Sequence, residues 1–191
     1  MRRVNTTLSA HIARPLRHSS NPHSRPPSPG MTSIWNTERR IIMRPNKHSY
    51  YLSIAEAVLA RSTCLRRKYG AVIVKDDEII STGYNGAPRG WPNCCDRGTC
   101  RREELQIPQG ERYELCKSVH AEENGIISSS RRDLIGSVLY LAGQEADGTP
   151  VLNAEPCAMC RRLIINAGID RVISRAADGG LHVLSIKNLK E

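Results

Sequence analysis

Two short stretches constrain this chain more than any other feature: His120-Ala121-Glu122 and Pro156-Cys157-Ala158-Met159-Cys160. One imidazole and two thiolates are ligands that zinc prefers, and three protein ligands leave a fourth position for water in catalytic zinc sites. Cys157 and Cys160 stand three positions apart, so a helix would place both sulfurs on one face. Pro156 suits the first turn of such a helix, whose positive end favours thiolate over thiol. The two stretches together predict a metal site.

Glu122 has a different predicted role, because residues two apart on a helix point in different directions. We therefore expect His120 to ligate the metal together with the two cysteines, and Glu122 to reach a water molecule on the metal. A carboxylate in that place can act as a proton shuttle. Each half of the pattern alone is ambiguous, since C-x-x-C also occurs in redox pairs and structural zinc sites.

The net charge of +9 is concentrated at the amino-terminal end. Residues 1–45 carry eight arginines and one acid, which leaves a net charge of +2 for residues 46–191. Residues 1–30 are rich in proline and serine and hold no acid, so we expect 1–45 to be a disordered extension before a folded domain over 46–191. Three interpretations stay open for it: a transit peptide, a basic arm for nucleic acid, or a gene start placed too early, since Met31 and Met43 precede the folded part.

The cysteine count bears on the compartment. Seven cysteines are an odd number, and two of them already belong to the metal pattern. Disulfide frameworks are typical of shorter secreted chains, so we expect a cytoplasmic protein with reduced thiols. No apolar run approaches the ~18 residues of a transmembrane helix, so we expect no membrane partner.

Hydrophobic periodicity predicts alternating helices and strands after residue 48. The predicted helices cover 49–62, 120–130 and 157–167, the last ended by Gly168. The predicted strands cover 70–75, 78–83, 137–142 and 171–174, with a further candidate over 181–186, and the first two form a hairpin. Residues 91–119 form a long polar loop, which is usually functional or held by a metal, and 143–154 form a polar insertion. This order predicts an α/β fold with helices covering a sheet of four to five strands.

Further segments carry a resemblance to a known family: RSTCLRRK (61–68), GAVIV (70–74), ISTGYNG (80–86), GERYELC (110–116), VHAEEN (119–124) and IINAGI (164–169). Together with the H-x-E…P-C-x-x-C pattern of zinc deaminases, they resemble the deoxycytidylate (dCMP) deaminases of the cytidine deaminase-like superfamily. The segments over 80–86 and 110–116 point to the dCMP branch. The resemblance implies a three-layer cytidine deaminase-like fold, with a central mixed sheet of four to five strands flanked by helices, over residues 46–191.

The resemblance also implies a reaction. It is the hydrolytic deamination of dCMP to dUMP and ammonia, which feeds thymidylate synthesis. His120, Cys157 and Cys160 would hold a catalytic Zn²⁺ that activates water. Glu122 would take the proton of this water, pass it to N3 of the cytosine and later protonate the leaving amine.

For the substrate, the resemblance implies contacts from Ala121 and from Asn85, the latter to the sugar. A turn asparagine that tolerates a left-handed backbone is the alternative for Asn85. The chain has no Phe, so an aromatic side chain stacked on the base would come from a short list of candidates. They are Tyr84, Tyr113, Tyr140 and Trp91.

Two further sites are implied by some members of the family. Cys64 and Cys94 fall where some members keep ligands of a second, structural zinc, and here Cys100 and Cys116, or Cys95, could complete that site; a set of reduced, unpaired cysteines is the alternative. Regulated members bind dCTP or dTTP with Mg²⁺, and here Gly86 and Arg89 are the candidates for contacting the phosphates. Members of this family often form hexamers or trimers, so we expect a homo-oligomer.

Two alternative functions stay open at this point. One is another zinc deaminase, acting on cytidine, a tRNA adenosine, or a pterin or riboflavin precursor. The other is a non-catalytic nucleic-acid-binding accessory protein built on a deaminase core. The intact metal and shuttle residues disfavour the second alternative, so a nucleic-acid partner is not the main expectation.

Overall fold

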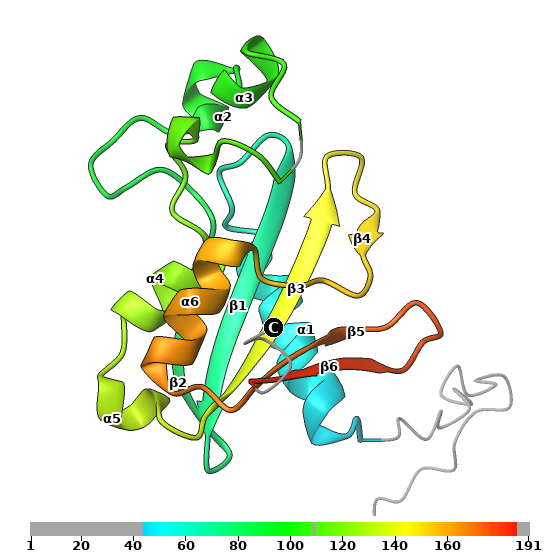
Figure 1. The fold of residues 1–191 in the computed structure, drawn as a ribbon. Coiled ribbons are helices and arrows are strands. Elements are labelled where there is room, and N and C mark those ends of the chain that lie inside the picture. Colours follow the sequence, from blue (N-terminus) through cyan, green and yellow to red (C-terminus); the bar gives the residue numbers. More distant parts are fainter. Residues whose placement is uncertain (1–43, 109, 187–191) are drawn as a thin grey trace, which may run out of the picture. The chain divides into compact units, whose positions relative to one another are not determined.

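The computed structural model describes residues 44–108 and 110–186, which form a mixed β-sheet with helices on both faces (Figure 1). The strand order is β2-β1-β3-β5-β6, and β4 pairs with β3 beside this path. The extension predicted for 1–45 lies outside the described residues, apart from its last two positions, so its disorder stays a prediction. Within the described ranges, no helix combines the length and the apolar character that crossing a membrane requires.

The sheet is mixed because one parallel contact joins two antiparallel parts. Its strands are β1 (Arg67–Lys75), β2 (Glu78–Tyr84), β3 (Val138–Glu145), β4 (Pro150–Val151), β5 (Arg171–Arg175) and β6 (Leu181–Ser185). β1 pairs antiparallel with β2 and β3, β3 runs parallel to β5, and β5 pairs antiparallel with β6. The predicted hairpin is present, and its turn residues Asp76 and Asp77 both have positive φ, as a two-residue type I′ turn requires.

One strand lies where the sequence predicts only a polar insertion, over residues 143–154. β3 continues to Glu145, the chain turns at Gly148 with φ of 92°, and β4 returns beside β3 with Val151 opposite Gly143. The predicted polar insertion therefore contains strand structure, and the prediction of four to five strands is wrong, since the sheet has six. A strand of two residues is too short to show the alternation by which strands are recognised.

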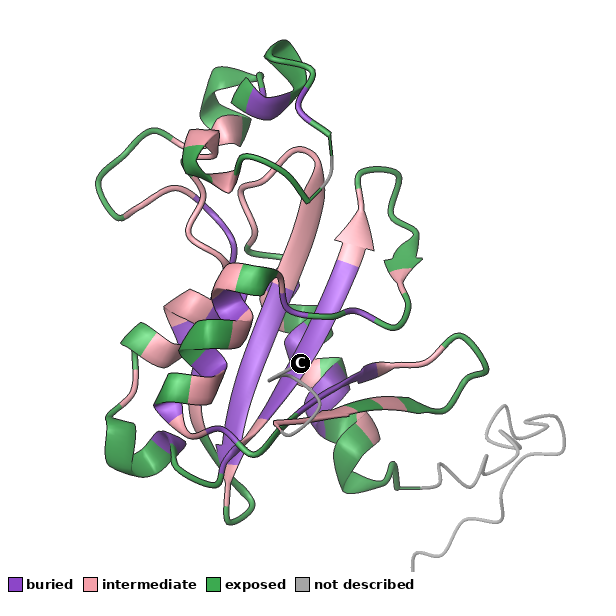
Figure 2. Ribbon diagram, viewed as in Figure 1, coloured by how far each residue is buried: buried purple, intermediate pink, exposed green. Residues whose placement is uncertain are grey.

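The two faces of the sheet are covered by different helices, which gives the expected three layers. These helices are α1 (Lys47–Leu59) on one face, and α4 (Ala121–Ile127) and α6 (Ala158–Ala167) on the other. Successive residues of β1 alternate between the two cores: Val72 packs with the α1 residues, and Ala71 and Ile73 pack with residues of α4 and α6. The central parts of β1 and β3 are accordingly buried on both faces (Figure 2).

The helices of the second face begin at the predicted metal ligands. His120 is the N-cap of α4, and its backbone N–H donates to the Glu123 side chain at 2.9 Å. Cys157 is the N-cap of α6, so Pro156 precedes the helix instead of lying in its first turn as predicted. Gly168, with φ of 83°, ends α6 as the sequence predicts.

A close contact fixes α4 on the sheet. A Cβ atom at Gly83 in β2 would lie 2.1 Å from the carbonyl oxygen of Ala121 and 2.5 Å from the backbone nitrogen of Gly125. Only glycine allows this approach. The first turn of α4, which follows His120 and contains Glu122, is therefore held directly against the backbone of β2.

The polar segment 91–119 has more local structure than the predicted loop. It contains α2 (Cys94–Arg97), α3 (Arg101–Glu104) and the 3₁₀ turn η1 (Tyr113–Leu115), and a further short helix, α5 (Arg131–Leu134), follows α4. Arg102 is buried within this segment and donates hydrogen bonds to the carbonyl oxygens of Pro108 at 2.7 Å and Arg112 at 3.1 Å. A buried charged side chain thus adds to the few apolar anchors of the segment, Cys100 and Ile107.

Candidate active site

The three predicted ligand residues meet where the amino-terminal ends of α4 and α6 come together. The Nδ1 atom of His120 lies 3.5 Å from Sγ of Cys157 and 3.3 Å from Sγ of Cys160. All three ligand atoms lie within 4.8 Å of one another. Ligand bonds of about 2.0–2.3 Å in a tetrahedral zinc site place ligand atoms roughly 3.5 Å apart, so this donor set fits one zinc ion.

The thiol groups are polarised by their contacts. Hydrogen bonds from Cys160 and His120 to the sulfur of Cys157 lower the pKa of Cys157 to about 4. The contact with Cys157 and burial raise the pKa of Cys160, and the contact with Cys157 also raises the pKa of His120. Because the thiolate is the form that binds metals, Cys157 is prepared for a cation.

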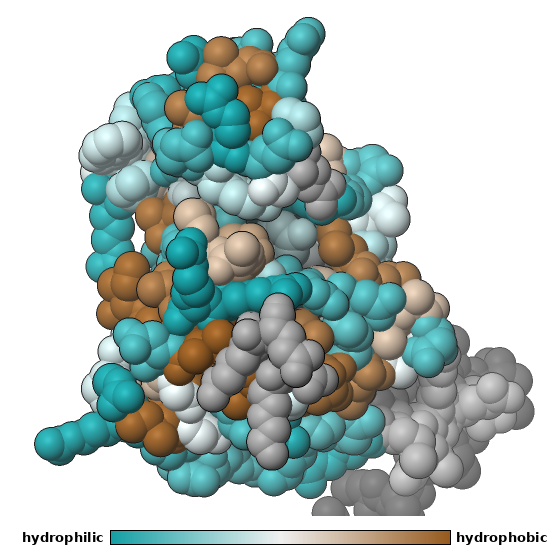
Figure 3. Space-filling view, in the orientation of Figure 1, coloured by the Kyte–Doolittle hydropathy of each residue, from teal (hydrophilic) through white to brown (hydrophobic). Residues whose placement is uncertain are grey.

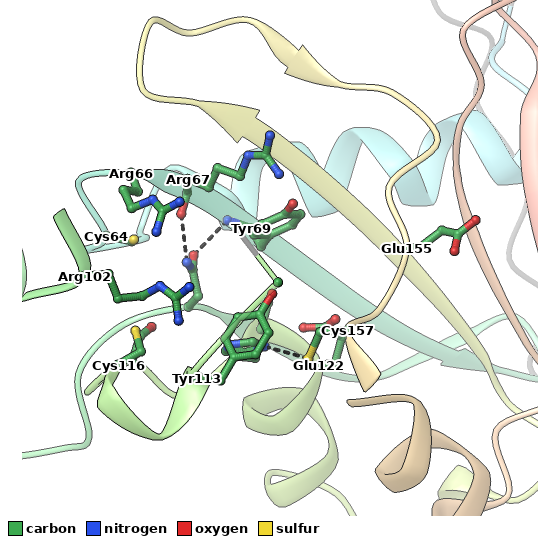
Figure 4. Close-up of a pocket in the computed structure, with 15 residues that line it drawn as sticks. Cys64, Arg66, Arg67, Tyr69, Arg102, Tyr113, Cys116, Glu122, Glu155 and Cys157 are labelled. Atoms are coloured by element: carbon green, nitrogen blue, oxygen red, sulfur yellow. Dashed lines mark hydrogen bonds between the residues drawn. The ribbon is translucent and has the colours of Figure 1, made fainter. Parts of the chain in front are cut away.

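Glu122 lies beside this cluster in the first turn of α4, and its residue is 5% exposed. Burial raises the pKa of Glu122 to about 7. Figure 4 shows its carboxyl group next to Cys157. A carboxyl group with a pKa near neutrality can both accept and return a proton, which suits the predicted shuttle.

The cluster opens into a pocket of about 200 Å³ (Figure 4). Residues from the α1–β1 loop, the end of β2, the 91–119 segment and both helix starts line it. They are Cys64, Arg66, Arg67, Tyr69, Asn85, Arg102, Gly110, Tyr113, Cys116, Ser118, His120, Ala121, Glu122, Glu155 and Cys157. The predicted site residues Ala121 and Asn85 thus lie in one pocket with the metal cluster.

Three arginines in this pocket were not predicted from the sequence: Arg66, Arg67 and Arg102. Arg67 is paired with Glu145, with Nε 2.7 Å from Oε2. Arg102 is only 5% exposed, and its hydrogen bonds go to backbone carbonyl oxygens instead of a carboxylate. Arginines in polar segments are usually solvated, so the sequence signal was weak, although Arg66 and Arg67 are adjacent and follow Cys64 closely.

The structure separates the aromatic candidates. Tyr113 lines the pocket, with its ring edge-on to His120 at 5.3 Å between centroids, and the guanidinium of Arg102 lies 4.9 Å from the Tyr113 ring centre. Tyr140 packs in the core beneath α1, and the other two candidates, Tyr84 and Trp91, are exposed and outside the pocket lining. Tyr69, which was not among the candidates, also lines the pocket.

The residues predicted to contact an effector lie outside the pocket lining. Both backbone groups of Gly86 pair with Val119, since its N–H donates to the Val119 oxygen at 3.2 Å and its oxygen accepts from the Val119 N–H at 2.8 Å. Arg89 is exposed. The effector site stays a prediction.

The cysteines predicted for a second zinc gather in one region. Burial raises the pKa of Cys94, and the nearby thiols of Cys64, Cys100 and Cys116 raise it further. Cys95 is exposed and its thiol contacts Asp96 instead. Among the described residues, however, only the cluster of His120 with the two α6 cysteines has three ligand atoms within 4.8 Å of one another.

Comparison with known proteins agrees with the geometry of the site. Residues 45–176 match the family model of the cytidine and deoxycytidylate deaminase zinc-binding region. The chain is 42% identical over 135 residues to the deoxycytidylate deaminase of Mycobacterium phage D29, which covers 68% of this chain and 94% of the phage protein. It is 33% identical over 132 residues to the deoxycytidylate deaminase of Saccharomyces cerevisiae, covering 69% of this chain but only 38% of the yeast protein.

A solved structure shows the same arrangement of elements. The dCMP deaminase of cyanophage S-TIM5, crystallised in complex with dCMP and dUMP, is 28% identical with a TM-score of 0.50, covering 78% of this chain and 93% of the cyanophage chain. The predicted cytidine deaminase-like fold is confirmed. This chain belongs to the cytidine and deoxycytidylate deaminase family, with the family's zinc-binding region at residues 45–176.

Proposed function

We propose that this protein catalyses the hydrolytic deamination of dCMP to dUMP and ammonia. The observation that carries the proposal is a single pocket with two chemically distinct ends. The metal end consists of His120, Glu122 and the cysteines Cys157 and Cys160, and the phosphate end consists of Arg66, Arg67 and Arg102. The names of the relatives in phage D29 and yeast support the same substrate.

At the metal end, His120, Cys157 and Cys160 would hold zinc. A zinc ion bound there would act as a Lewis acid that makes water a nucleophile at neutral pH. Glu122 takes the proton that water releases as it attacks C4 of the cytosine, and delivers this proton to N3. It then takes the proton of the hydroxyl group now on C4 and gives it to the amino group, which leaves as ammonia while the C4 carbonyl of dUMP forms. The raised pKa of Glu122 suits both transfers, since one carboxyl group must act as base and then as acid.

The phosphate end favours a nucleotide over a nucleoside. A phosphate monoester is a dianion with several acceptor oxygens, and arginine recognises it through paired N–H donors. Arg102 is buried without a carboxylate partner among its hydrogen bonds, so an anionic substrate would compensate its charge. Arg66, in the wall beside it, would supply a second guanidinium.

We also propose that the protein is a cytoplasmic homo-oligomer. Its seven cysteines are free thiols, as a reducing compartment requires. Apolar side chains reach the surface in Figure 3. Ile127 in α4 and Leu163 in α6 are among the exposed apolar residues. Exposed apolar surface of this kind supports contacts between copies. Regulation by dCTP and dTTP with Mg²⁺ stays part of the proposal.

A structural zinc on Cys64, Cys94, Cys100 and Cys116 is the second metal that we propose. Four thiolates are a usual donor set for structural zinc. Their sulfurs are near one another but not close enough to share an ion as they stand. Binding would therefore draw the 94–116 segment inward, and its metal affinity would contribute to its folding.

The test is ammonia release from dCMP, measured beside deoxycytidine and cytidine, for the wild-type protein and Glu122→Gln. We expect dCMP to be the best substrate, and the variant to lose activity by about 10²–10⁴-fold with unchanged zinc content. Equal turnover of cytidine and dCMP would contradict the nucleotide assignment. Loss of zinc in Glu122→Gln would contradict the division between ligands and shuttle.

A further inference from the structure

Asn85 is the centre of a hydrogen-bond network that connects the end of β2 to residues 62–69. It follows β2 directly, is 7% exposed, and lies beside residues 62–69, which we call the arginine loop because they carry Arg66 and Arg67. The arginine loop comprises the end of the connection between α1 and β1 and the first three residues of β1, and it contributes four of the residues that line the pocket. They are Cys64, Arg66, Arg67 and Tyr69.

The side chain of Asn85 is bonded to the arginine loop at three points. Its Oδ1 accepts from the hydroxyl of Ser62 at 2.6 Å and from the backbone N–H of Tyr69 at 2.7 Å. Its Nδ2 donates to the backbone oxygen of Arg67 at 2.8 Å. Dashed lines in Figure 4 show the bonds to Arg67 and Tyr69. An asparagine side chain offers about four hydrogen-bonding positions, so three are already used inside the protein.

The backbone of Asn85 continues this connection. Its oxygen accepts from the N–H of Thr63 at 3.3 Å, and its N–H donates to the oxygen of Tyr69 at 3.2 Å. The hydroxyl of Ser62 also accepts from the N–H of Cys64 at 3.3 Å, which extends the network to the pocket wall. Both ends of the arginine loop are thereby fixed to one residue.

The neighbouring position shows how closely the loop is seated. A Cβ atom at Gly86 would lie 2.5 Å from the hydroxyl oxygen of Thr63. The arginine loop therefore rests directly on the backbone at 85–86. Its first five residues, 62–66, precede β1 and have no strand pairing of their own, so these contacts decide their path.

We propose that Asn85 is a positioning residue that holds the arginine loop so that Arg66 faces the pocket, and that it thereby sets the preference for a phosphorylated substrate. This inference rests on the proposed function. It differs from the expected sugar contact in its consequence: a sugar contact acts equally on dCMP and deoxycytidine, which share the deoxyribose, whereas the loop acts on the phosphate alone.

Ser62 provides the sharper test, because it does not line the pocket and reaches the arginines only through Asn85 and the loop backbone. Ser62→Ala removes one hydrogen bond and Ser62→Thr keeps the hydroxyl donor. We expect Ser62→Ala to lower the ratio of kcat/KM for dCMP to that for deoxycytidine by about two- to tenfold, through a raised KM for dCMP. Turnover of deoxycytidine should be unchanged, and Ser62→Thr should restore the wild-type ratio.

Asn85→Ala should lower the same ratio further, by about tenfold or more, since it removes all three bonds. Equal losses for both substrates in Asn85→Ala, or an unchanged ratio in Ser62→Ala, would overturn the inference. Calorimetric titration with dUMP and with deoxyuridine gives a second measurement that needs no turnover, with the same loss expected for dUMP alone. If the wild type binds dUMP but does not deaminate dCMP, the proposed function fails while the titration still tests the role of Asn85.

Discussion

The two ends of the pocket are built by different kinds of structure. The metal end stands on the starts of α4 and α6, which pack on the sheet over a buried apolar core and, at Gly83, through direct backbone contact. The phosphate end stands on the arginine loop and the 91–119 segment, which are held by hydrogen bonds to backbone oxygens and to Asn85. We therefore expect core packing to position the residues that carry out the reaction, and polar contacts to position those that select a phosphorylated substrate. A core contact cannot be altered without cost to the whole fold, whereas a polar contact can be altered locally.

The largest expected effect comes from Gly83→Ala, which acts on the metal end. The added methyl group would overlap the backbone of α4, so we expect a loss of about 3 kcal/mol or more in the free energy of unfolding, together with loss of bound zinc. Denaturant unfolding and metal analysis measure both. Thr82→Ala, at an exposed position next to it, is the matched control and should change stability by less than about 1 kcal/mol. A stable, zinc-loaded Gly83→Ala protein would contradict the inference that the close approach at Gly83 holds α4 in place.

Arg102→Met tests the phosphate end. It removes the hydrogen bonds to the Pro108 and Arg112 oxygens and the positive charge, so kcat/KM for dCMP should fall by about 10–100-fold, with a smaller loss for deoxycytidine. Steady-state kinetics with both substrates measures the difference. Arg101→Met changes an exposed neighbour and should leave both values within about twofold. Equal losses of kcat/KM for the two substrates would show that Arg102 has a structural role and does not contact the phosphate.

The second zinc gives a smaller effect, confined to the 91–119 segment. We expect two zinc ions per chain in the wild type and one in Cys100→Ser, with a lower Tm but zinc retained at the metal end. Cys95→Ser should keep both ions, since its exposed thiol points to Asp96. Mass spectrometry of the intact protein and metal analysis count the ions. A single zinc ion per chain in the wild type would contradict the proposed second zinc site.

The smallest expected effect is that of Tyr113→Phe. The ring contacts with His120 and Arg102 are kept and only the hydroxyl is lost, so kcat/KM for dCMP should change by less than about fivefold. Tyr113→Ala should cost more, because it also removes the ring that joins the two ends of the pocket. If Tyr113→Phe and Tyr113→Ala lower kcat/KM for dCMP equally, the hydroxyl group contacts the substrate, and the ring contacts matter less than we infer.

The difference between the metal end and the phosphate end also explains which site residues could be predicted from the sequence. His120, Glu122, Cys157 and Cys160 were predicted because each lies at a helix start whose spacing the sequence displays. Gly168 likewise ends α6 where it was expected. These features depend on residues that are close in the sequence, so a short motif is enough to predict them.

The arginines were missed because their placement depends on distant contacts. Arg66 lies on the arginine loop, whose neighbouring residue Arg67 is bonded to Asn85, and the Arg102 side chain depends on the path of the segment that follows it. Tyr69 was missed for the same reason. Strand β4 was not predicted because a strand of two residues shows no hydrophobic periodicity. Side chains held by non-local hydrogen bonds leave no regular pattern in the sequence.

The N-cap of α4 has one more consequence. The carboxylate of Glu123 accepts a hydrogen bond from the backbone N–H of His120, so the main chain of a predicted metal ligand is held by a residue outside the pocket lining. Release of an ion begins with the loss of one ligand, and this hydrogen bond fixes the main chain from which the His120 side chain extends. We therefore expect changes at Glu123 to shorten the time that the metal stays bound more than they slow turnover by the loaded enzyme.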